Sequence, residues 1–478
     1  MVKKSIISIL FFALTVSLIF PALPARAATP FREIVAKSAL LAEADSGTVL
    51  FDHNMDQRHP ADGLAKIMTL LLAVDACMNG DANEEDPVEM TDSAWLNINA
   101  NSPTMGISPG EEMPLIDLMY CALMGGASEA CNMIAEHIAG SVEAFVRSMN
   151  EQADKLGCKS TNFTNANGQY NVRQYTTAMD QFLIFREALS NPLFAEITGS
   201  YRHTIESTNT SEPRSLISSN SLLNSNGKYY FSPCSSGLAS ATFEGGYSFI
   251  AFAEADELSL VSIVLGSDII ILEDESTQMR NLTESRRLFE WGFSQFGWRT
   301  VLSSGEPVDK APVLHGDGAD FVNLRPETTI RLLLDNDVLD SDFKPVVRLY
   351  SDEAGEALTA PVTAGEVLGE MILTRRVRRG EVVLAGEVHD DVVEYEPVLL
   401  VANTNVGLHR LVFIKMQLSV LLSSKPAKIT IWVLAGLVAL YIALVVRYNI
   451  IRRKRLYRIK EAKKKLADER RGSFDDFE

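Results

Sequence analysis

An uncharged apolar run near the end of the chain separates a large first part from a short tail. Residues 429–446, ITIWVLAGLVALYIALVV, carry no charge, and about 18 such residues suffice for a helix to span a bilayer. The run that follows, RYNIIRRKRLYRIKEAKKKL, is densely basic, which indicates the cytoplasmic side of a membrane. We therefore predict a single-pass protein of the cell membrane. Residues 28–427 are expected to be extracellular, 429–446 to form the transmembrane helix and 447–478 to form a basic cytoplasmic tail.

The first residues have the pattern of a secretory signal peptide. Two lysines precede the apolar stretch SIISILFFALTVSLIF, and the A-x-A sequence at 25–27 has the form of a cleavage site. We expect residues 1–27 to be a signal peptide and the mature chain to begin near Ala28. The alternative is an uncleaved anchor helix, which is less favoured because the apolar stretch is short.

Charge and cysteine content narrow the classes of partner. The formal net charge is −18 although the tail is basic, so the exterior part is acidic and nucleic acid is not expected as a partner. The five cysteines are scattered and odd in number, which indicates small buried residues rather than a disulfide framework. The chain has no C-x-x-C motif and no cluster of His and Cys. We therefore expect neither a metal site nor a cofactor.

The spacing of apolar residues predicts an α+β domain in the first part of the exterior. The predicted elements are a β-hairpin at 38–52 that turns at Asp45-Ser46-Gly47, a buried helix at 64–77, a helix at 141–157 that Ser141 caps, and paired strands at 247–253 and 258–266. Strands at both ends with helices between them indicate one α+β domain at 28–300.

The segments after this domain have a different pattern. Short strands separated by Gly, Pro and Asp turns, without a long amphipathic helix, predict a small β-sandwich domain at 305–403. Residues 404–428 form a juxtamembrane segment. Its apolar stretch at 408–424 predicts either an interfacial helix on the membrane or the last packed helix of the exterior, and the sequence favours neither.

Several stretches together resemble one known family. SALLAEADSGTVLFDHNMDQRHPADGLAKIMTLLLAVDA and LMYCALMGGASEACNMIAEHIAG are similar to the D-alanyl-D-alanine carboxypeptidases, low-molecular-weight penicillin-binding proteins of peptidase family S11. YTTAMD, NSLL and SRRLFEWGF continue the match, and APVTAGEVLGE resembles the family's second domain. The resemblance implies a β-lactamase/transpeptidase-like fold, a β-rich second domain, and hydrolase chemistry on peptidoglycan in the cell wall.

The family's catalysis rests on three motifs, of which S-x-x-K supplies the nucleophile. Its serine attacks the substrate carbonyl, and the lysine three residues later takes the proton. The resemblance places Lys66 at the lysine position, as a remnant general base, and Gly63 at the nucleophile position. Because glycine has no side chain, position 63 offers no atom for acyl transfer.

The other two motifs are also degenerate. In S-x-N, the resemblance places Gly126 at the hydroxyl position and Ser128 at the amide position. In K-T-G, whose lysine attracts the substrate's carboxylate, it places Ser235, Ser236 and Gly237, so the cation is lost. We expect these five residues to be the substrate-binding positions, because in the family both motifs line the groove that holds the substrate.

Loss of all three motifs predicts a pseudoenzyme with a binding or scaffold role in peptidoglycan metabolism. Its expected partners are peptidoglycan stem peptides or cell-wall proteins. The alternative is an active serine-type D-Ala-D-Ala carboxypeptidase with a displaced nucleophile, for which Ser128 and Ser235 are the first residues to consider. A third interpretation is a sensor that passes an exterior event to the basic tail.

Lys66 requires an explanation of its own because the helix around it is apolar. Asp62 stands four residues earlier, a spacing that predicts an ion pair on one helix face. Asp62 is also a suitable N-cap for that helix. Thr69, one turn beyond the lysine, is expected to point into the core.

Overall fold

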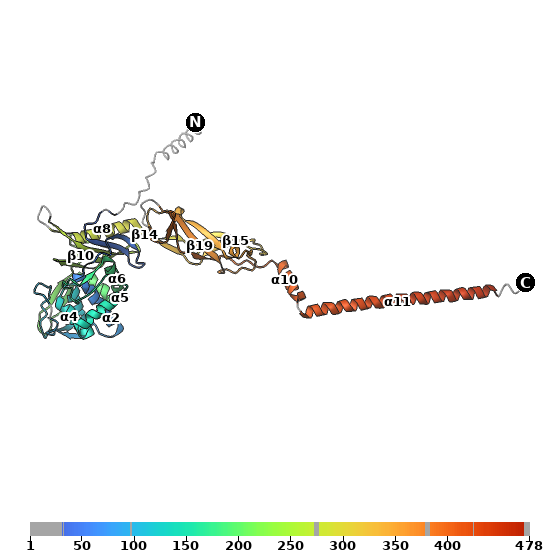
Figure 1. Ribbon diagram of the computed structural model, residues 1–478, viewed down its shortest axis with the longest axis horizontal. Coiled ribbons are helices and arrows are strands. Elements are labelled where there is room, and N and C mark those ends of the chain that lie inside the picture. Colours follow the sequence, from blue (N-terminus) through green and yellow to red (C-terminus); the bar gives the residue numbers. More distant parts are fainter. Residues whose placement is uncertain are drawn as a thin grey trace, which may run out of the picture. The chain divides into compact units, whose positions relative to one another are not determined.

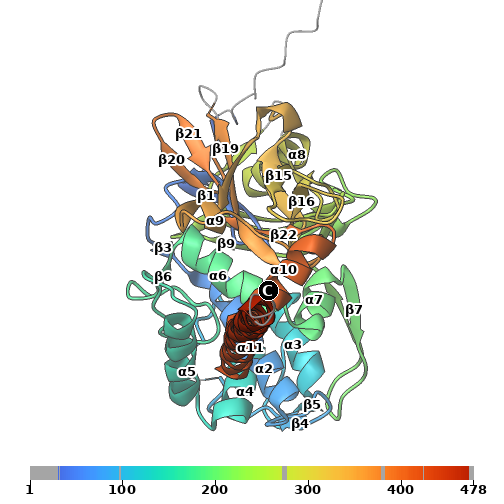
Figure 2. The same ribbon diagram turned by 90° about the vertical axis from the view of Figure 1, so that its right-hand side faces the viewer.

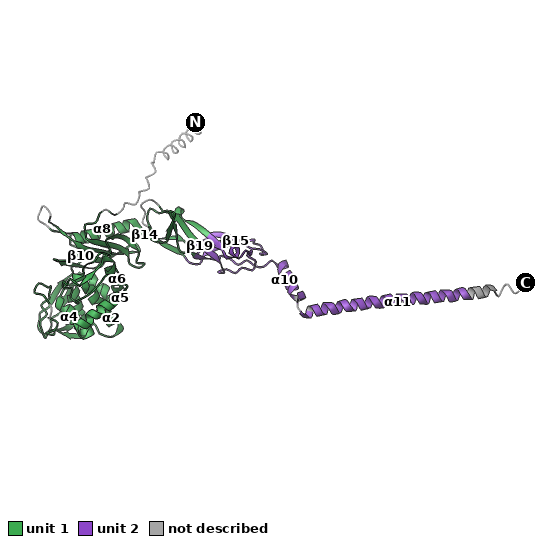
Figure 3. Ribbon diagram, viewed as in Figure 1, with its two compact units in different colours: residues 1–303, 329–346, 372–397 green, residues 304–328, 347–371, 398–478 purple. Residues whose placement is uncertain are grey.

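The structure is a computed structural model that describes residues 31, 33–95, 98–271, 277–377, 383–423 and 425–472. The predicted signal peptide at 1–27 lies outside these residues. Contacts divide the chain into two compact units, which Figure 3 shows in different colours. The first unit comprises residues 1–303, 329–346 and 372–397, and the second comprises 304–328, 347–371 and 398–478.

A five-stranded antiparallel sheet with the order β2-β1-β11-β10-β9 forms the base of the first unit. Its strands are β1 (Ser38–Glu43), β2 (Val49–His53), β9 (Cys234–Thr242), β10 (Gly246–Ala255) and β11 (Leu258–Ser267). The predicted hairpin at 38–52 is confirmed as β1 and β2, and the predicted strand pair is confirmed as β10 and β11. Strand β9 forms one edge of the sheet.

Helices cover both faces of this sheet. Successive side chains of a strand point to opposite faces, and in β1 Leu41 packs in one apolar cluster with helix α8 (Arg280–Gln295). Its neighbour Leu40 belongs to the other cluster, with helices α2 (Ala65–Asn79) and α6 (Ala178–Leu189). Figure 1 shows α8 on one side of β10 and the α2 and α6 helices on the other. Every residue of β1 is buried as a result.

The predicted buried helix at 64–77 is confirmed as α2, which Figure 2 shows among the other helices of this layer. Its neighbours are α3 (Leu115–Leu123), α4 (Ser128–Ala139), α5 (Val142–Lys155), α6 and α7 (Pro192–Gly199). A helix that is apolar on nearly all sides is expected in such a position. Ser141 caps α5, as predicted, because its hydroxyl oxygen accepts a hydrogen bond from the Ala144 amide at 3.1 Å.

Short elements complete the first unit. They are the 3-10 helices η1 (Asp62–Leu64), η2 (Ser221–Leu223) and η3 (Asp340–Asp342), and the strands β3 (His59–Pro60), β4 (Pro87–Glu89), β5 (Glu112–Pro114), β6 (Tyr175–Thr176), β7 (Arg202–Ile205), β8 (Arg214–Ile217), β12 (Ile269–Ile271), β13 (Thr277–Met279), β14 (Phe296–Leu302), β17 (Ile330–Asp335), β20 (Glu387–His389) and β21 (Val392–Glu394).

The second unit begins with strands, in agreement with the predicted change of pattern after residue 305. Strands β15 (Asp309–Pro312), β16 (Phe321–Pro326), β22 (Val398–Ala402) and β19 (Val367–Arg376) pair in that order and are antiparallel. Strand β18 (Lys344–Leu349) and helix α9 (Tyr350–Glu353) lie between β17 and β19 in the chain. The contact division falls within β18 and β19, so the domain limits 28–300 and 305–403 stay predictions.

Two helices end the described chain. In α10 (Arg410–Ser423) apolar side chains such as Phe413 and Ile414 are 50% and 59% exposed, which argues against the packed-helix alternative for 408–424. Helix α11 (Lys425–Gly472) follows. Within the described residues, its part Lys428–Lys465 is the one helix long and apolar enough to cross a membrane, judged by length and composition.

Candidate functional site

The predicted nucleophile position lies in a tight turn that leads into α2. The turn is η1, so Gly63 stands at its centre and Lys66 stands in the first turn of α2. Gly168 packs against η1 with a φ of +74°, and a Cβ at 168 would lie 2.5 Å from the Asp62 carbonyl oxygen. A side chain at 168 would therefore prevent this close approach.

Lys66 is buried, with 6% of the residue exposed. Its ammonium group donates a hydrogen bond to the carbonyl oxygen of Gly126, so the first two motifs meet at this contact. Burial lowers the pKa of the Lys66 amine, whereas Cys131 and Glu129 act in the opposite direction. A lysine in this state suits the role of a base, and position 63 provides no hydroxyl for it to deprotonate.

The predicted ion pair between Asp62 and Lys66 is wrong. Asp62 adopts a φ of +41°, and its carboxylate oxygen Oδ2 accepts a hydrogen bond from the Thr242 hydroxyl instead. Asp62 is also not the N-cap of α2, because it lies inside η1 and Leu64 precedes the helix. Burial raises the pKa of the Asp62 carboxyl; the bond from Thr242 opposes this rise and Glu244 adds to it.

The S-x-N positions lie at the start of α4. Gly126 has a φ of +66°, a conformation that L side chains rarely adopt, and a Cβ there would lie 3.7 Å from Lys66 Nζ. Ser128 is the first residue of α4 and is 1% exposed. Its amide donates a hydrogen bond to the Pro103 carbonyl oxygen at 2.9 Å, which joins α4 to the preceding loop.

A pocket of about 710 Å³ brings four of the predicted positions together: Gly63, Lys66, Gly126 and Ser128 line it. Among the described residues that line the pocket, Lys66 is the one basic side chain and Glu244 is the one acidic side chain. A concave site with a few convergent polar groups is the usual form of a binding site for a small ligand.

The predicted third motif lies elsewhere, and this part of the prediction is corrected. Ser235, Ser236 and Gly237 are not among the residues that line the pocket. Ser235 is exposed, and the buried hydroxyl of Ser236 bonds to that of Thr198 at 2.5 Å. The pocket is lined instead by the next residues of β9, from Leu238 to Thr242.

Ser240 fills the space in front of Gly63. An ideal Cβ at 63 would lie 2.6 Å from Ser240 Oγ and 3.2 Å from Ser240 Cβ, so a serine at 63 would require Ser240 to move. A glycine in a K-T-G motif would leave this space open. We therefore assign the third motif to 238–240, where Leu238 replaces the lysine and Ser240 replaces the glycine. Pairing of β9 with β10, in which Thr242 lies opposite Gly246 and Leu238 opposite Ile250, fixes which residues of β9 reach the pocket.

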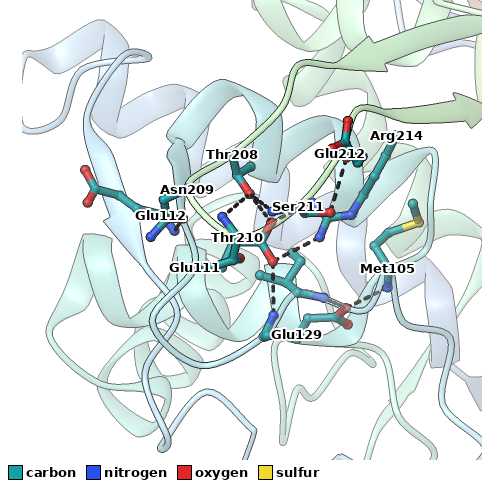
Figure 4. A network of polar contacts seen from close by, with 12 residues as sticks. Met105, Glu111, Glu112, Glu129, Thr208, Asn209, Thr210, Ser211, Glu212 and Arg214 are labelled. Atoms are coloured by element: carbon teal, nitrogen blue, oxygen red, sulfur yellow. Dashed lines mark hydrogen bonds and ion pairs between the residues drawn. The ribbon is translucent and has the colours of Figure 1, made fainter.

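Two hydrogen bonds to Glu129 hold the loop that forms one wall of the pocket (Figure 4). The Glu129 carboxylate accepts hydrogen bonds from the amides of Met105 at 2.6 Å and Ile107 at 3.4 Å. Pro103, in the same loop, lines the pocket. The carboxylate therefore fixes the backbone of this loop and provides a partner for the Ile107 amide, which is buried.

An ion pair stabilises the continuation of this loop. Arg214 donates two hydrogen bonds to Glu111, at 2.7 and 2.9 Å, and the Thr208 hydroxyl donates a third at 2.8 Å, as Figure 4 shows. Burial acts to raise the pKa of Glu111, but the bonds from Arg214, Thr208 and the Ser108 amide hold that pKa below its ordinary value. Glu111 is thus a buried carboxylate with full compensation.

Cys131, Thr69 and Ser240 carry further side chains near the pocket or in the adjacent core that could act as a nucleophile, and their surroundings differ. Burial raises the pKa of the Cys131 thiol to about 11, so the thiol stays protonated at neutral pH. Thr69 is buried and donates its hydroxyl proton to the Ala166 carbonyl oxygen at 2.7 Å, which confirms that it points into the core. Ser240 has the hydroxyl nearest to the side-chain position of residue 63.

Sheet, helical layer and groove together have the fold of a penicillin-binding protein of the transpeptidase type. Residues 24–269 match the family described as D-alanyl-D-alanine carboxypeptidase, Peptidase S11. The chain belongs to this family, and both the predicted family and the α+β transpeptidase-like fold are confirmed.

Similar proteins match over most of the chain. D-alanyl-D-alanine carboxypeptidase DacF of Bacillus subtilis is 27% identical over 341 residues, which cover 71% of this chain and 82% of that protein. DacA of Escherichia coli is 28% identical over 341 residues, or 70% and 79%. The solved structure of penicillin-binding protein 5 from Haemophilus influenzae has a TM-score of 0.56 at 25% identity, and the match covers 79% of this chain and 99% of that one.

Proposed function

We propose that this protein is a catalytically inactive member of its family that is anchored in the membrane and binds peptidoglycan stem peptides in the pocket. One observation carries the proposal: Gly63 stands at the nucleophile position, and Ser240 fills the space before it. In a serine hydrolase, loss of the nucleophile alone costs on the order of 10⁶ in rate. The named relatives are D-alanyl-D-alanine carboxypeptidases, which supports a stem peptide as the ligand.

The pocket is open and lined by the motif positions, which supports ligand binding by this protein. Lys66, Gly126 and Ser128 still converge on one open pocket, and Glu129 still fixes its wall. A scaffold role with cell-wall proteins fits the same pocket. A protein that binds a stem peptide without cleaving it stays bound to the cell wall, where it can hold partner proteins.

One observation favours a second candidate, an active carboxypeptidase with a displaced nucleophile. Ser240 brings a hydroxyl to the place where the family's serine would stand. Among the described residues, however, no hydrogen bond joins this hydroxyl to Lys66, whose bond goes to Gly126. A nucleophile without an aligned base is weak, so we place this candidate second.

The stem-peptide proposal is tested by paired variants of β9. Full-length protein in detergent is expected to bind a synthetic stem peptide that ends in D-Ala-D-Ala, measured by calorimetry. Ser240→Trp, which places a large side chain in the pocket in front of Gly63, is expected to weaken binding about tenfold or more. Ser235→Trp on the same strand lies outside the pocket and should leave affinity unchanged. Equal effects of both variants, or no binding by the unmodified chain, would contradict the proposal.

For topology, we infer that 28–427 is extracellular and that the tail from about 447 is cytoplasmic. The Lys and Arg residues that follow the apolar run support this orientation. Protease added to intact protoplasts should remove the exterior part and spare a tag at the C-terminus, read by immunoblot. Permeabilised protoplasts should lose the tag. Loss of the tag from intact protoplasts would reverse the orientation.

A further inference from the structure

The mouth of the pocket carries two aromatic side chains that the protein core does not use. Phe243 is 100% exposed and Tyr170 is 43% exposed, and both line the pocket. A single exposed aromatic residue on a surface is ordinary. These two come from separate segments and border the same polar pocket, so a ligand in the pocket would have an exposed aromatic ring available on each segment.

The position of Phe243 is fixed by a contact that this chain makes at Asp62. Phe243 lies in the turn between β9 and β10, directly after Thr242. The Thr242 hydroxyl donates to the Asp62 carboxylate and accepts a hydrogen bond from the Gly245 amide at 2.9 Å. The turn is therefore tied to η1, the same segment that carries Gly63, and Phe243 is held at the pocket rather than on a free loop.

Neutral amide groups make up much of the polar lining near these rings. Asn99, Asn101 and Gln169 line the pocket, and the Gln169 side-chain oxygen accepts a hydrogen bond from the Asn99 amide at 3.2 Å. Among the described residues, no hydrogen bond engages the side-chain amides of Asn99 and Asn101. The lining therefore offers donors and acceptors with little charge, which suits a neutral, polar ligand.

We propose that this rim, formed by Tyr170, Phe243, Asn99, Asn101 and Gln169, binds N-acetylated sugar rings of a glycan. A pyranose presents C–H groups on its faces, which pack on the negative face of an aromatic ring, and hydroxyl and acetamido groups at its edge, which pair with amides. The inference rests on the proposed function: it adds the sugar backbone of peptidoglycan to the peptide as the ligand of the same pocket.

The test uses tetra-N-acetylchitotetraose as the probe and full-length protein in detergent. Saturation-transfer NMR should detect the sugar on the unmodified protein, and titration should give its affinity. Phe243→Ala is expected to weaken sugar binding about tenfold, and Phe243→Trp is expected to retain it. Phe321→Ala removes a ring that is 41% exposed on β16 and outside the pocket, so affinity should not change. Because Phe243 makes no buried contact, the melting temperatures of the variants should agree.

Each outcome decides between the two proposals. Loss of sugar affinity in Phe243→Ala with normal affinity for the stem peptide supports the sugar site. Stem-peptide binding without any sugar binding, or sugar binding that Phe243→Ala leaves unchanged, overturns the sugar site and leaves the proposed function in place. Absence of binding for both probes overturns both.

Discussion

Full-length protein is expected to release no D-alanine from a D-Ala-D-Ala peptide and to form no ester adduct with benzylpenicillin. Gly63 supplies no oxygen, and Lys66 donates to the Gly126 carbonyl oxygen instead of facing a serine. Leu238 supplies no cation for the substrate's carboxylate. A loss on the order of 10⁶ in rate places turnover below detection. Intact-protein mass spectrometry and a D-alanine assay measure the two results, with an active family member as positive control.

A stepwise rebuilding tests why the site is inactive. Gly63→Ser alone should yield little, because Ser240 must shift to admit the new side chain and the variant still lacks the cation and the amide of the other two motifs. Adding Ser240→Gly opens this space, and adding Leu238→Lys and Ser128→Asn restores the carboxylate anchor and the amide. The combined variant is expected to form a measurable penicillin adduct, because such residues act as a unit. Gly126 is kept, since a serine would be strained at a φ of +66°.

The control for the rebuilt variant has alanine at position 63 in the same background. It carries the same changes without a nucleophile and should stay unlabelled. An ester adduct on the unmodified protein would contradict the inactive interpretation, and mapping it to Ser240 would establish the displaced-nucleophile alternative. A folded combined variant that stays unlabelled would contradict the prediction that these four changes suffice without a hydroxyl at position 126.

The local sequence pattern was sufficient to predict the hairpin of β1 and β2 and the start of α5. The turn residues Asp45-Ser46-Gly47 between alternating strands predict β1 and β2, and these strands form as expected. Ser141 before an apolar helical face predicts the start of α5, and its hydroxyl makes the cap. Both signals act within a few residues, so tertiary contacts have little room to override them.

Contacts between distant segments could not be predicted in this way. The rule for residues four apart applies when both are helical, and Asp62 is in η1 with a φ of +41°. Its partner Thr242 is 180 residues away. Similarly, the run CSSGLASAT in β9 offers several small residues that match a degenerate motif. The register is fixed by pairing with β10 and by the contact between Ser240 and position 63.

Replacement of Arg214 by alanine is expected to have the largest effect on stability, lowering the free energy of unfolding by about 3 kcal/mol or more. Glu111 is 1% exposed, and the variant leaves its carboxylate buried without the guanidinium that accounts for two of its hydrogen bonds. Chemical denaturation measures the change. Glu111→Gln in the Arg214→Ala background should recover part of the loss, because it removes the uncompensated charge.

An exposed ion pair serves as the control, because it shows how much stability an arginine–glutamate pair contributes without burial. Arg286 and Glu290 are 2.7 Å apart but 41% and 51% exposed, so Glu290→Ala, which leaves the other contacts of Arg286 in place, should cost about 0.5 kcal/mol or less. The pH dependence of the free energy of unfolding gives a second check on the pair of Arg214 and Glu111. The pKa of Glu111 is held below its ordinary value, so the stabilisation is complete above that ordinary pKa and is lost as pH falls through the lowered one. The difference between the wild-type chain and Arg214→Ala should therefore narrow in acid. A difference that stays constant across this range would show that the loss comes from packing of the arginine stem rather than from the ion pair.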